Sequence, residues 1–373
     1  MSWTKERIAK THLAHFNGFG SRRLRGIFEY FDEPWAACTA PSVELERIGI
    51  PSEVARKFVE WRKTSDPDQE LTRLEREGIR VVLPDDEEYP MLLRESSDRP
   101  EVLFVRGMIP VEPAIAIVGT RHISSYGKQC VESIVPELVQ TGMAIISGLA
   151  VGIDGYAHEL TLTHKGKTLA FLGTGVDNEH IYPRYNYDLA QRMLAQGGGI
   201  ASEFPPGTEG LKGHFPIRNR LIASFCLATI VIEAAEDSGS LITAKLALEE
   251  NREVMAVPGP IWSDTSKGSN RLLKAGAKVC TSAKDILDAL SIDQPELVSQ
   301  ARALLPLNDQ EQQIIHFLSE PRHIDRISRD LDLKPHQIAS SLSLLEMKGL
   351  VQSIGGQMWL RTATSHPSKK KSK

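Results

Sequence analysis

The apolar residues between positions 78 and 290 fall into short runs, and amphipathic stretches of helix length lie between the later runs. The runs lack apolar–polar alternation, which is typical of strands covered on both faces. Strands that alternate with helices favour parallel pairing through crossover helices. We therefore expect an α/β domain over residues 66–290, with a Rossmann-like, doubly wound and mostly parallel sheet. The expected strands are Ile79–Leu83, Ala114–Val118, Ala144–Ile146, Leu169–Leu172, Ile200–Ala201, Thr229–Ile232 and Val254–Val257, and the expected helices include Tyr126–Gln140, Tyr185–Gln196 and Leu241–Glu250.

Residues 1–65 have the apolar spacing of short helices instead. Asn17-Gly18-Phe19-Gly20 interrupts that spacing, and a basic segment with Arg22, Arg23 and Arg25 follows it. Glycines in such a turn let backbone amides meet a phosphate, as in a helix–hairpin–helix motif. The region is also compatible with a domain like the sterile alpha motif (SAM), which would serve structure or partner binding. We expect a helical domain of one of these two kinds.

The C-terminal region has the pattern of a winged helix. Residues 291–308 have no strong periodicity and are interpreted as a linker, and the polar, lysine-rich tail 362–373 is expected to be disordered. Between them, over 309–361, we expect helices at Gln310–Leu318, Ile324–Leu331 and Pro335–Lys348 and a hairpin of Leu350–Ile354 and Gln357–Leu360 around Gly355-Gly356. The third helix has lysine only at its end, which argues against sequence-specific reading of duplex DNA.

Composition excludes several classes of protein. The 373 residues carry 44 basic and 48 acidic side chains, so any nucleic-acid site depends on local clusters of charge. No apolar run reaches the length of a membrane span, and the N-terminus has no apolar secretory signal. The four cysteines are far apart, which fits reduced thiols in the cytoplasm and excludes the usual zinc spacing.

Several enzyme motifs are incomplete. Gly166-Lys167-Thr168 lacks the first glycine of a P-loop, and His158-Glu159 lacks the second histidine of a zinc protease. Gly173-Thr174-Gly175 does not continue into a dinucleotide fingerprint, and no Ser/His/Asp signature is present. We therefore expect no catalytic residues, no metal and no cofactor.

Small residues follow four of the expected strands. The carboxyl ends of parallel strands are where open α/β sheets bind ligands, and backbone amides at helix N-termini attract anions. The alternative is that these glycines only close tight turns between strands and helices. The four loops are Gly119-Thr120-Arg121, Ser147–Asp154 with Gly148, Gly173-Thr174-Gly175 with Arg184 downstream, and Ser238-Gly239-Ser240.

The segment Leu211–Arg220 carries three cations, an amide and an aromatic ring within ten residues. Cations bind phosphates, and Phe215 can stack on an unpaired base, so the combination favours single-stranded nucleic acid over a duplex. The alternative places Phe215 in the core and pairs the arginines with Glu203, Glu233 or Glu236.

In chain order, these motifs closely resemble the DNA-processing protein A (DprA/Smf) family over roughly residues 80–290. The resemblance rests on Gly119-Thr120-Arg121, Ser147–Ala150, Gly152-Ile153-Asp154, Ala157-His158, Gly173–Asp177, Tyr182-Pro183, Phe215–Arg220, Gly239–Ala244 and Val257-Pro258-Gly259. It implies a cytoplasmic bacterial protein, not an enzyme, that binds incoming single-stranded DNA during natural transformation. Such proteins protect the strand, help load the RecA recombinase in homologous recombination and usually act as dimers; a single-strand-binding protein is a further expected partner.

The family's functional positions carry over residue by residue. The resemblance implies DNA-binding roles for Arg121, Lys212, Phe215 and the segment Arg218-Asn219-Arg220. Together with the loops, the candidate DNA-binding residues are Gly119, Arg121, Gly148, Arg184, Lys212, Phe215, Arg218, Asn219, Arg220, Gly239 and Ser240. The family's self-association helix corresponds to Gly268–Ala277, with Asn270, Arg271, Leu272 and Leu273 as candidates; Ser269 and Arg271 stand where cysteine and histidine are commoner.

Two other functions stay open. A small-nucleotide enzyme, such as a phosphoribohydrolase, uses the same architecture, with Glu203 or Glu233 as a base. That class typically carries Pro-Gly-Gly-x-Gly-Thr, whereas this chain has Pro258–Trp262 without the second glycine. The other alternative is a duplex-specific regulator acting through the winged helix.

Overall fold

The computed structural model describes residues 3–290, 309–318, 322–331, 333–347, 350–353 and 357–361. Two compact units are present, Met1–Ile286 and Leu287–Lys373, and each is described by itself. The expected linker 291–308, the turn at Gly355-Gly356 and the tail 362–373 lie outside the described residues.

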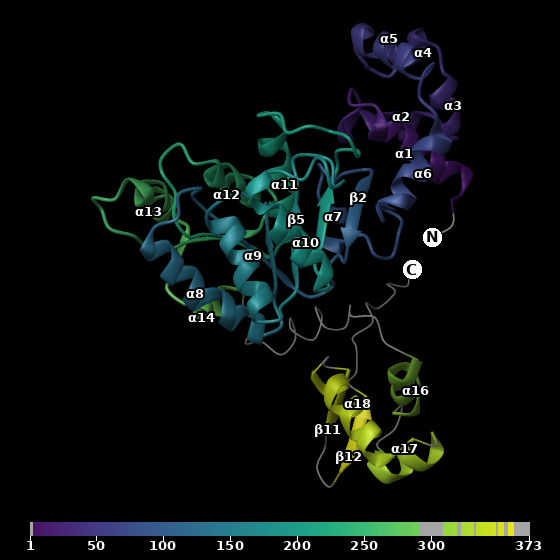
Figure 1. Cartoon of the computed structure of the whole chain (residues 1–373). Coiled ribbons are helices and arrows are strands. Elements are labelled where there is room, and N and C mark those ends of the chain that lie inside the picture. Colours follow the sequence, from purple (N-terminus) through teal and green to yellow (C-terminus); the bar gives the residue numbers. More distant parts are fainter. Residues whose placement is uncertain are drawn as a thin grey trace, which may run out of the picture. The chain divides into compact units, whose positions relative to one another are not determined.

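A nine-stranded sheet forms the centre of the first unit (Figure 1). Its order is β1-β2-β6-β5-β4-β3-β7-β8-β9, and all neighbours from β6 to β9 pair in parallel. The pairs β1–β2 and β2–β6 are antiparallel, which confirms a mostly parallel sheet. The strands are β1 (Arg80–Val82), β2 (Leu103–Gly107), β3 (Ala114–Val118), β4 (Ala144–Ser147), β5 (Thr168–Phe171), β6 (Gly199–Ser202), β7 (Ala228–Val231), β8 (Glu253–Ala256) and β9 (Lys278–Val279).

Helices cover both faces of this sheet, as expected for buried strands without polar alternation. On one face, Ala116 and Val118 of β3 share a core with Leu221 of α11 and Ala244 of α12. The helices are α7 (Met91–Glu95), α8 (Ser125–Gln140), α9 (Ile153–Thr163), α10 (Tyr187–Ala195), α11 (His214–Phe225), α12 (Gly239–Glu249), α13 (Lys267–Lys274) and α14 (Ala283–Ala289), with short 3₁₀ turns η1 (Arg184–Asn186) and η2 (Asp264–Ser266).

Six helices at the N-terminus pack around a core in which Phe16, Phe19 and Phe58 are in ring contact. The same core continues into the sheet domain at Phe104 and Leu172. The helices are α1 (Lys5–His15), α2 (Ser21–Tyr30), α3 (Pro34–Thr39), α4 (Ser42–Arg47), α5 (Ser52–Trp61) and α6 (Pro67–Arg76). Ion pairs fix this group to the sheet domain: Arg7 contacts Asp86 at 3.0 Å and Arg25 contacts Glu101 at 2.7 Å.

The second unit contains the helices α16 (Asp309–Phe317), α17 (Ile324–Asp330) and α18 (Pro335–Met347). Its strands are β10 (Arg322–His323), β11 (Val351–Ser353) and β12 (Met358–Arg361), paired antiparallel in the order β10-β12-β11. The buried residues Ile314, Ile327, Ile338 and Leu342 connect its helices into one core. These elements form the winged-helix pattern that the sequence predicts, with β10 as an addition.

Candidate nucleic-acid interface

The loop after β3 is held from two sides. The Thr120 amide donates to the carbonyl of Glu233 at 2.7 Å, and the Ile153 amide at the start of α9 donates to the Thr120 carbonyl at 3.1 Å. These bonds join the ends of β3 and β7 to α9, while the side chain of Arg121 remains exposed. The structure therefore presents Arg121 to solvent at the carboxyl edge of the sheet.

Arg218 of α11 lies inside that edge, with only 6% of its surface exposed. It donates to the carbonyl of Gly148 at 2.7 Å and to that of Phe171, and its Nε donates to Asn219 Oδ1 at 3.1 Å. Burial lowers the pKa of Arg218 to about 10, with Asp154 opposing the shift, so the side chain is cationic at neutral pH. Arg218 thus supplies a fixed interior charge and connects the ends of β4 and β5.

Two of the predicted loop glycines are required by packing. A Cβ on Gly148 would lie 2.6 Å from the Arg218 guanidinium, and one on Gly119 would lie 2.6 Å from the side chain of Ile153. A Cβ on Gly239 would meet nothing within 4 Å. Gly119 and Gly148 are thus needed for close packing against Ile153 and Arg218, whereas the backbone is open at Gly239.

An aromatic platform lies beside these loops. The half-buried ring of Phe215 packs on Gly173, where a Cβ would approach it to 2.9 Å, and its centroid is 5.5 Å from that of Tyr182. Lys212 is exposed on the turn before α11. Tyr185, which is 83% exposed, was not among the predicted residues because the sequence contains nothing that separates it from a buried tyrosine.

The start of α12 adjoins the first turns of α11. Asn219 Nδ2 donates to the carbonyl of Gly239 at 3.3 Å, so these two predicted residues are in contact. Ser240 is buried, and its amide donates to the capping hydroxyl of Ser238 at 3.4 Å. This turn therefore exposes the backbone of Gly239 more than the side chain of Ser240.

Arg220 faces away from Phe215, toward the N-terminal helices. It is buried, forms an ion pair with Glu203 and donates to the carbonyl of Asp98 at 2.6 Å. The predicted alternative, an arginine of this segment paired with Glu203, is realised at this position. Arg220 also donates to the hydroxyl of Ser21 on α2 at 3.3 Å, and it thereby connects the sheet domain to the N-terminal helices.

Arg184 lies in the connection between β5 and α10. It is exposed, donates to the carbonyl of Asn178 at 2.9 Å, and its guanidinium lies 4.0 Å from the ring centroid of Tyr187. The face of the Tyr187 ring attracts this cation and helps to hold it at the surface.

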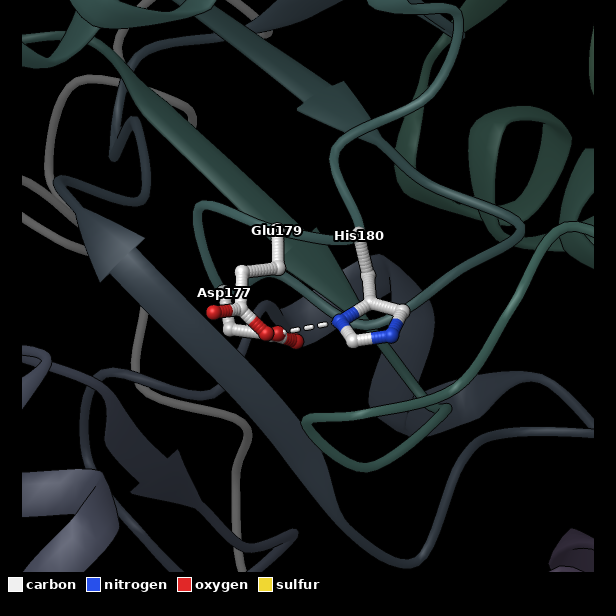
Figure 2. A group of neighbouring side chains, drawn as sticks. All are labelled: Asp177, Glu179 and His180. Carbon is white, nitrogen blue, oxygen red and sulfur yellow. Dashed lines mark hydrogen bonds and ion pairs between the residues drawn. The ribbon is translucent and has the colours of Figure 1, made fainter.

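The loop after β5 contains a cluster of potential metal ligands, Asp177, Glu179 and His180, whose ligand atoms lie within 4.8 Å of one another (Figure 2). The buried Asp177 carboxylate accepts from the Gly207 amide at 2.9 Å, pairs with Arg73 of α6 at 3.2 Å and contacts His180. With these protein contacts, the carboxylate connects the loop to the N-terminal helices.

Glu233, a candidate base in the enzyme alternative, is 2% exposed at the end of β7. It accepts from the Ser124 amide at 3.0 Å, from the Ser124 hydroxyl at 2.7 Å and from Thr265 at 3.0 Å. Its carboxylate is therefore engaged in positioning the start of α8.

The candidate self-association residues on α13 differ in their surroundings. Asn270 exchanges two hydrogen bonds with the backbone of Gly259, at 3.0 and 3.2 Å. Leu272 and Leu273 are half-buried against the sheet domain, whereas Arg271 is exposed. Arg271 is thus the one of these four with its side chain at the surface.

Fold and site together define a Rossmann-like protein that gathers exposed cations and an aromatic platform at the carboxyl edge of its sheet. Within the described ranges, no helix combines the length and apolarity needed to cross a bilayer. Residues 80–291 match the family model for DNA recombination-mediator protein A, and residues 298–357 match the DprA winged helix domain. The chain belongs to the DNA recombination-mediator protein A family, which confirms the resemblance.

Relatives match over most of the chain. Protein Smf of Synechocystis is 32% identical, over 91% of this chain and 94% of its own length. DNA processing protein DprA of Bacillus subtilis is 41% identical, over 59% of this chain and 74% of its own. The structure of DNA processing protein A from Streptococcus pneumoniae has a TM-score of 0.63 at 34% identity, and the match covers 77% of this chain and 98% of that protein's chain. A structure that addresses the single-stranded DNA binding mode of DNA processing protein A from Helicobacter pylori has a TM-score of 0.51 at 28% identity. This match covers 58% of this chain and 96% of that protein's chain.

Proposed function

We propose that this protein binds single-stranded DNA without sequence specificity, through residues 66–290. The observation that carries the proposal is the half-buried ring of Phe215 beside exposed Lys212, on the same sheet edge as Arg121. Cations neutralise phosphates of any sequence, and an aromatic face accepts any unpaired base. Arg184, Asn219 and the backbone of Gly239 extend this surface, and Arg218 holds it together from within.

The proposal extends to a role in natural transformation and homologous recombination, with protection of the incoming strand and loading of RecA. Membership of the DNA recombination-mediator protein A family supports this role, and the structure of the Helicobacter pylori relative concerns the binding of single-stranded DNA, on which each of these steps depends. RecA and a single-strand-binding protein are the proposed partners, and the cytoplasm is the proposed location because incoming strands meet recombinase there. We propose a non-enzymatic protein, since Glu203 and Glu233 both engage protein groups.

Fluorescence anisotropy tests the proposal with one labelled oligonucleotide, first single-stranded and then annealed to its complement, across a salt titration. We expect tighter binding of the single strand and a steep fall in affinity with salt, because phosphate contacts release counterions. Equal affinity for strand and duplex, or no binding, would overturn it. Release of base or phosphate from nucleotides would instead favour the enzyme alternative.

We further propose that the protein forms a homodimer through α13. Because Arg271 is exposed while Asn270 anchors Gly259, Arg271→Glu should weaken self-association and leave the subunit folded. Sedimentation velocity over a concentration series measures this effect, with Lys245→Glu on α12 as the matched control. A wild-type chain that sediments as a monomer throughout would contradict the proposal.

A further inference from the structure

A pocket of about 440 Å³ lies between the N-terminal helices and α11, separate from the platform of Phe215. The turn between α1 and α2 contributes Phe16 and Phe19, and α11 contributes His214 and Ile217. The His214 ring stacks on Phe204 with centroids 4.2 Å apart. Flat aromatic walls in a pocket of this size suit a planar ring of nucleobase dimensions.

One wall carries a buried acceptor without a partner. The Glu203 side chain is 8% exposed, and its Oε2 accepts hydrogen bonds from the Ser21 hydroxyl at 2.8 Å and from the Arg220 guanidinium. Among the described residues, Glu203 Oε1 has no hydrogen-bond partner, and neither has Nδ1 of His214. A buried carboxylate oxygen without a donor costs free energy, so a ligand that brings a donor gains affinity.

The rim of the pocket carries two arginines and one carboxylate. Arg22 forms an ion pair with Asp98 at 2.9 Å, whereas Arg23 donates to the carbonyl of Gly18 at 2.7 Å. Arg22 and Arg23 line the pocket at the first turn of α2, a ten-residue helix whose N-cap, Gly20, provides no side-chain cap. Amides at an uncapped helix N-terminus attract a phosphate, and so does the guanidinium of Arg23, which has no ion pair with a carboxylate among the described residues. The pocket therefore combines a site for a phosphate with a site for a base.

We propose that this pocket binds a nucleotide of the same DNA strand that crosses Phe215, and prefers a base with an exocyclic amino group. The inference rests on the proposed function and adds a modest preference for one base at a single nucleotide of a strand that is otherwise bound without regard to sequence. Successive residues of α11 serve the two sites, since Phe215 packs on Gly173 while His214 lines the pocket. A strand leaving the platform over the first turn of α11 reaches the pocket directly.

The chemistry of Glu203 sets the base preference. Cytosine presents an amino group that a carboxylate oxygen accepts well. Thymine presents its N3–H between two carbonyl oxygens, which repel the carboxylate. The two pyrimidines have nearly the same size, so a difference between them reports this hydrogen bond.

The test compares anisotropy of labelled oligo(dC) and oligo(dT) of one length at one salt concentration. For the wild-type chain we expect oligo(dC) to bind about five- to tenfold more tightly, which is the net effect of one typical hydrogen bond. Ile217→Trp fills the pocket from a position that is 47% exposed, and should bring the ratio close to one. Glu203→Gln should do the same, and thermal unfolding checks that it folds; if it does not, Ile217→Trp carries the test.

Arg23→Ala should weaken both oligonucleotides, whereas Arg56→Ala, which removes an exposed arginine of α5, is the matched control. A wild-type ratio near one, or a preference that survives Ile217→Trp, would overturn the inference. Failure of the proposed function has a different signature, in which neither oligonucleotide binds or Arg121→Ala leaves both affinities unchanged.

Discussion

The guanidinium of Arg218 occupies the space that a side chain on Gly148 would need, with its Cζ 2.6 Å from the ideal Cβ position. The same guanidinium donates to the Gly148 carbonyl, so the glycine and the arginine fit only as a pair. Because Asn219 follows Arg218 and contacts Gly239, displacement of the arginine would move the loops after β4 and before α12 together.

Gly148→Ala should therefore destabilise the fold. Overpacking of a tight interior costs about 1–3 kcal/mol, and here the arginine cannot leave without losing its carbonyl partners. Urea denaturation measures the loss, and Gly239→Ala, at a position with open space, is the control. Equal midpoints for wild type and Gly148→Ala would contradict the packing described here.

Arg121→Ala and Lys212→Ala should weaken binding of all single strands alike. Each removed phosphate contact should make the slope of log affinity against log salt shallower by about 0.7. Anisotropy over a salt series measures the slope, with Arg56→Ala as the control for loss of an exposed cation. Unchanged slopes would show that these cations do not contact the DNA.

Phe215→Leu should separate stacking from charge. Loss of the aromatic face should cost about 1–3 kcal/mol of binding free energy, while the salt slope stays as in the wild type because no cation is removed. Phe215→Tyr keeps the ring and should retain affinity. The same anisotropy assay measures both, and a Leu variant that binds normally would place the DNA elsewhere.

His158 should contribute to acid sensitivity. Burial lowers its pKa to about 3, from about 6.5 in the unfolded chain. Between these values the unfolded chain holds one more proton than the folded chain, so the free energy of unfolding falls as the pH drops, by about 1.4 kcal/mol per unit from this group.

Replacing His158 with Leu should reduce the fall in the free energy of unfolding between pH 6.5 and pH 4.5. Urea midpoints across this range provide the measurement, and His122→Leu, at an exposed position, is the control for loss of a histidine. A variant with the wild-type slope would show that His158 does not set the pH dependence.

The buried parallel strands were predictable because each is a short, continuous apolar run. Ala114–Val118 coincides with β3, and the runs for β4 to β8 were placed within one or two residues. β2 and β9 were not predicted. Leu103–Gly107 follows a polar stretch that contains Pro100, and Lys278–Val279 is an exposed edge pair whose pairing depends on β8. Such strands form because they pair with other strands of the sheet, and the pattern of residues within the segment does not indicate that pairing.

For the candidate site, the sequence identified the loops but did not indicate which of their side chains are buried and which are exposed. Arg121, Arg218 and Arg220 are equally basic in a sequence, yet one is exposed and two are buried among carbonyls and carboxylates. Burial of the last two depends on Gly148 and Glu203, which are distant in the chain. The pocket beside α2 also required the fold, since its walls come from both domains.

Two buried carboxylates near the proposed DNA path are neutralised or covered by the N-terminal helices. Asp177 pairs with Arg73 of α6, and Glu203 accepts from Ser21 of α2. A chain without these helices would leave Asp177 without Arg73 and would uncover Glu203, which keeps its ion pair with Arg220. The uncompensated charge of Asp177 would then repel a strand at the phosphate-binding surface. The N-terminal helices therefore raise the affinity for DNA by neutralising Asp177 and covering Glu203, in addition to any contact that they make with DNA themselves.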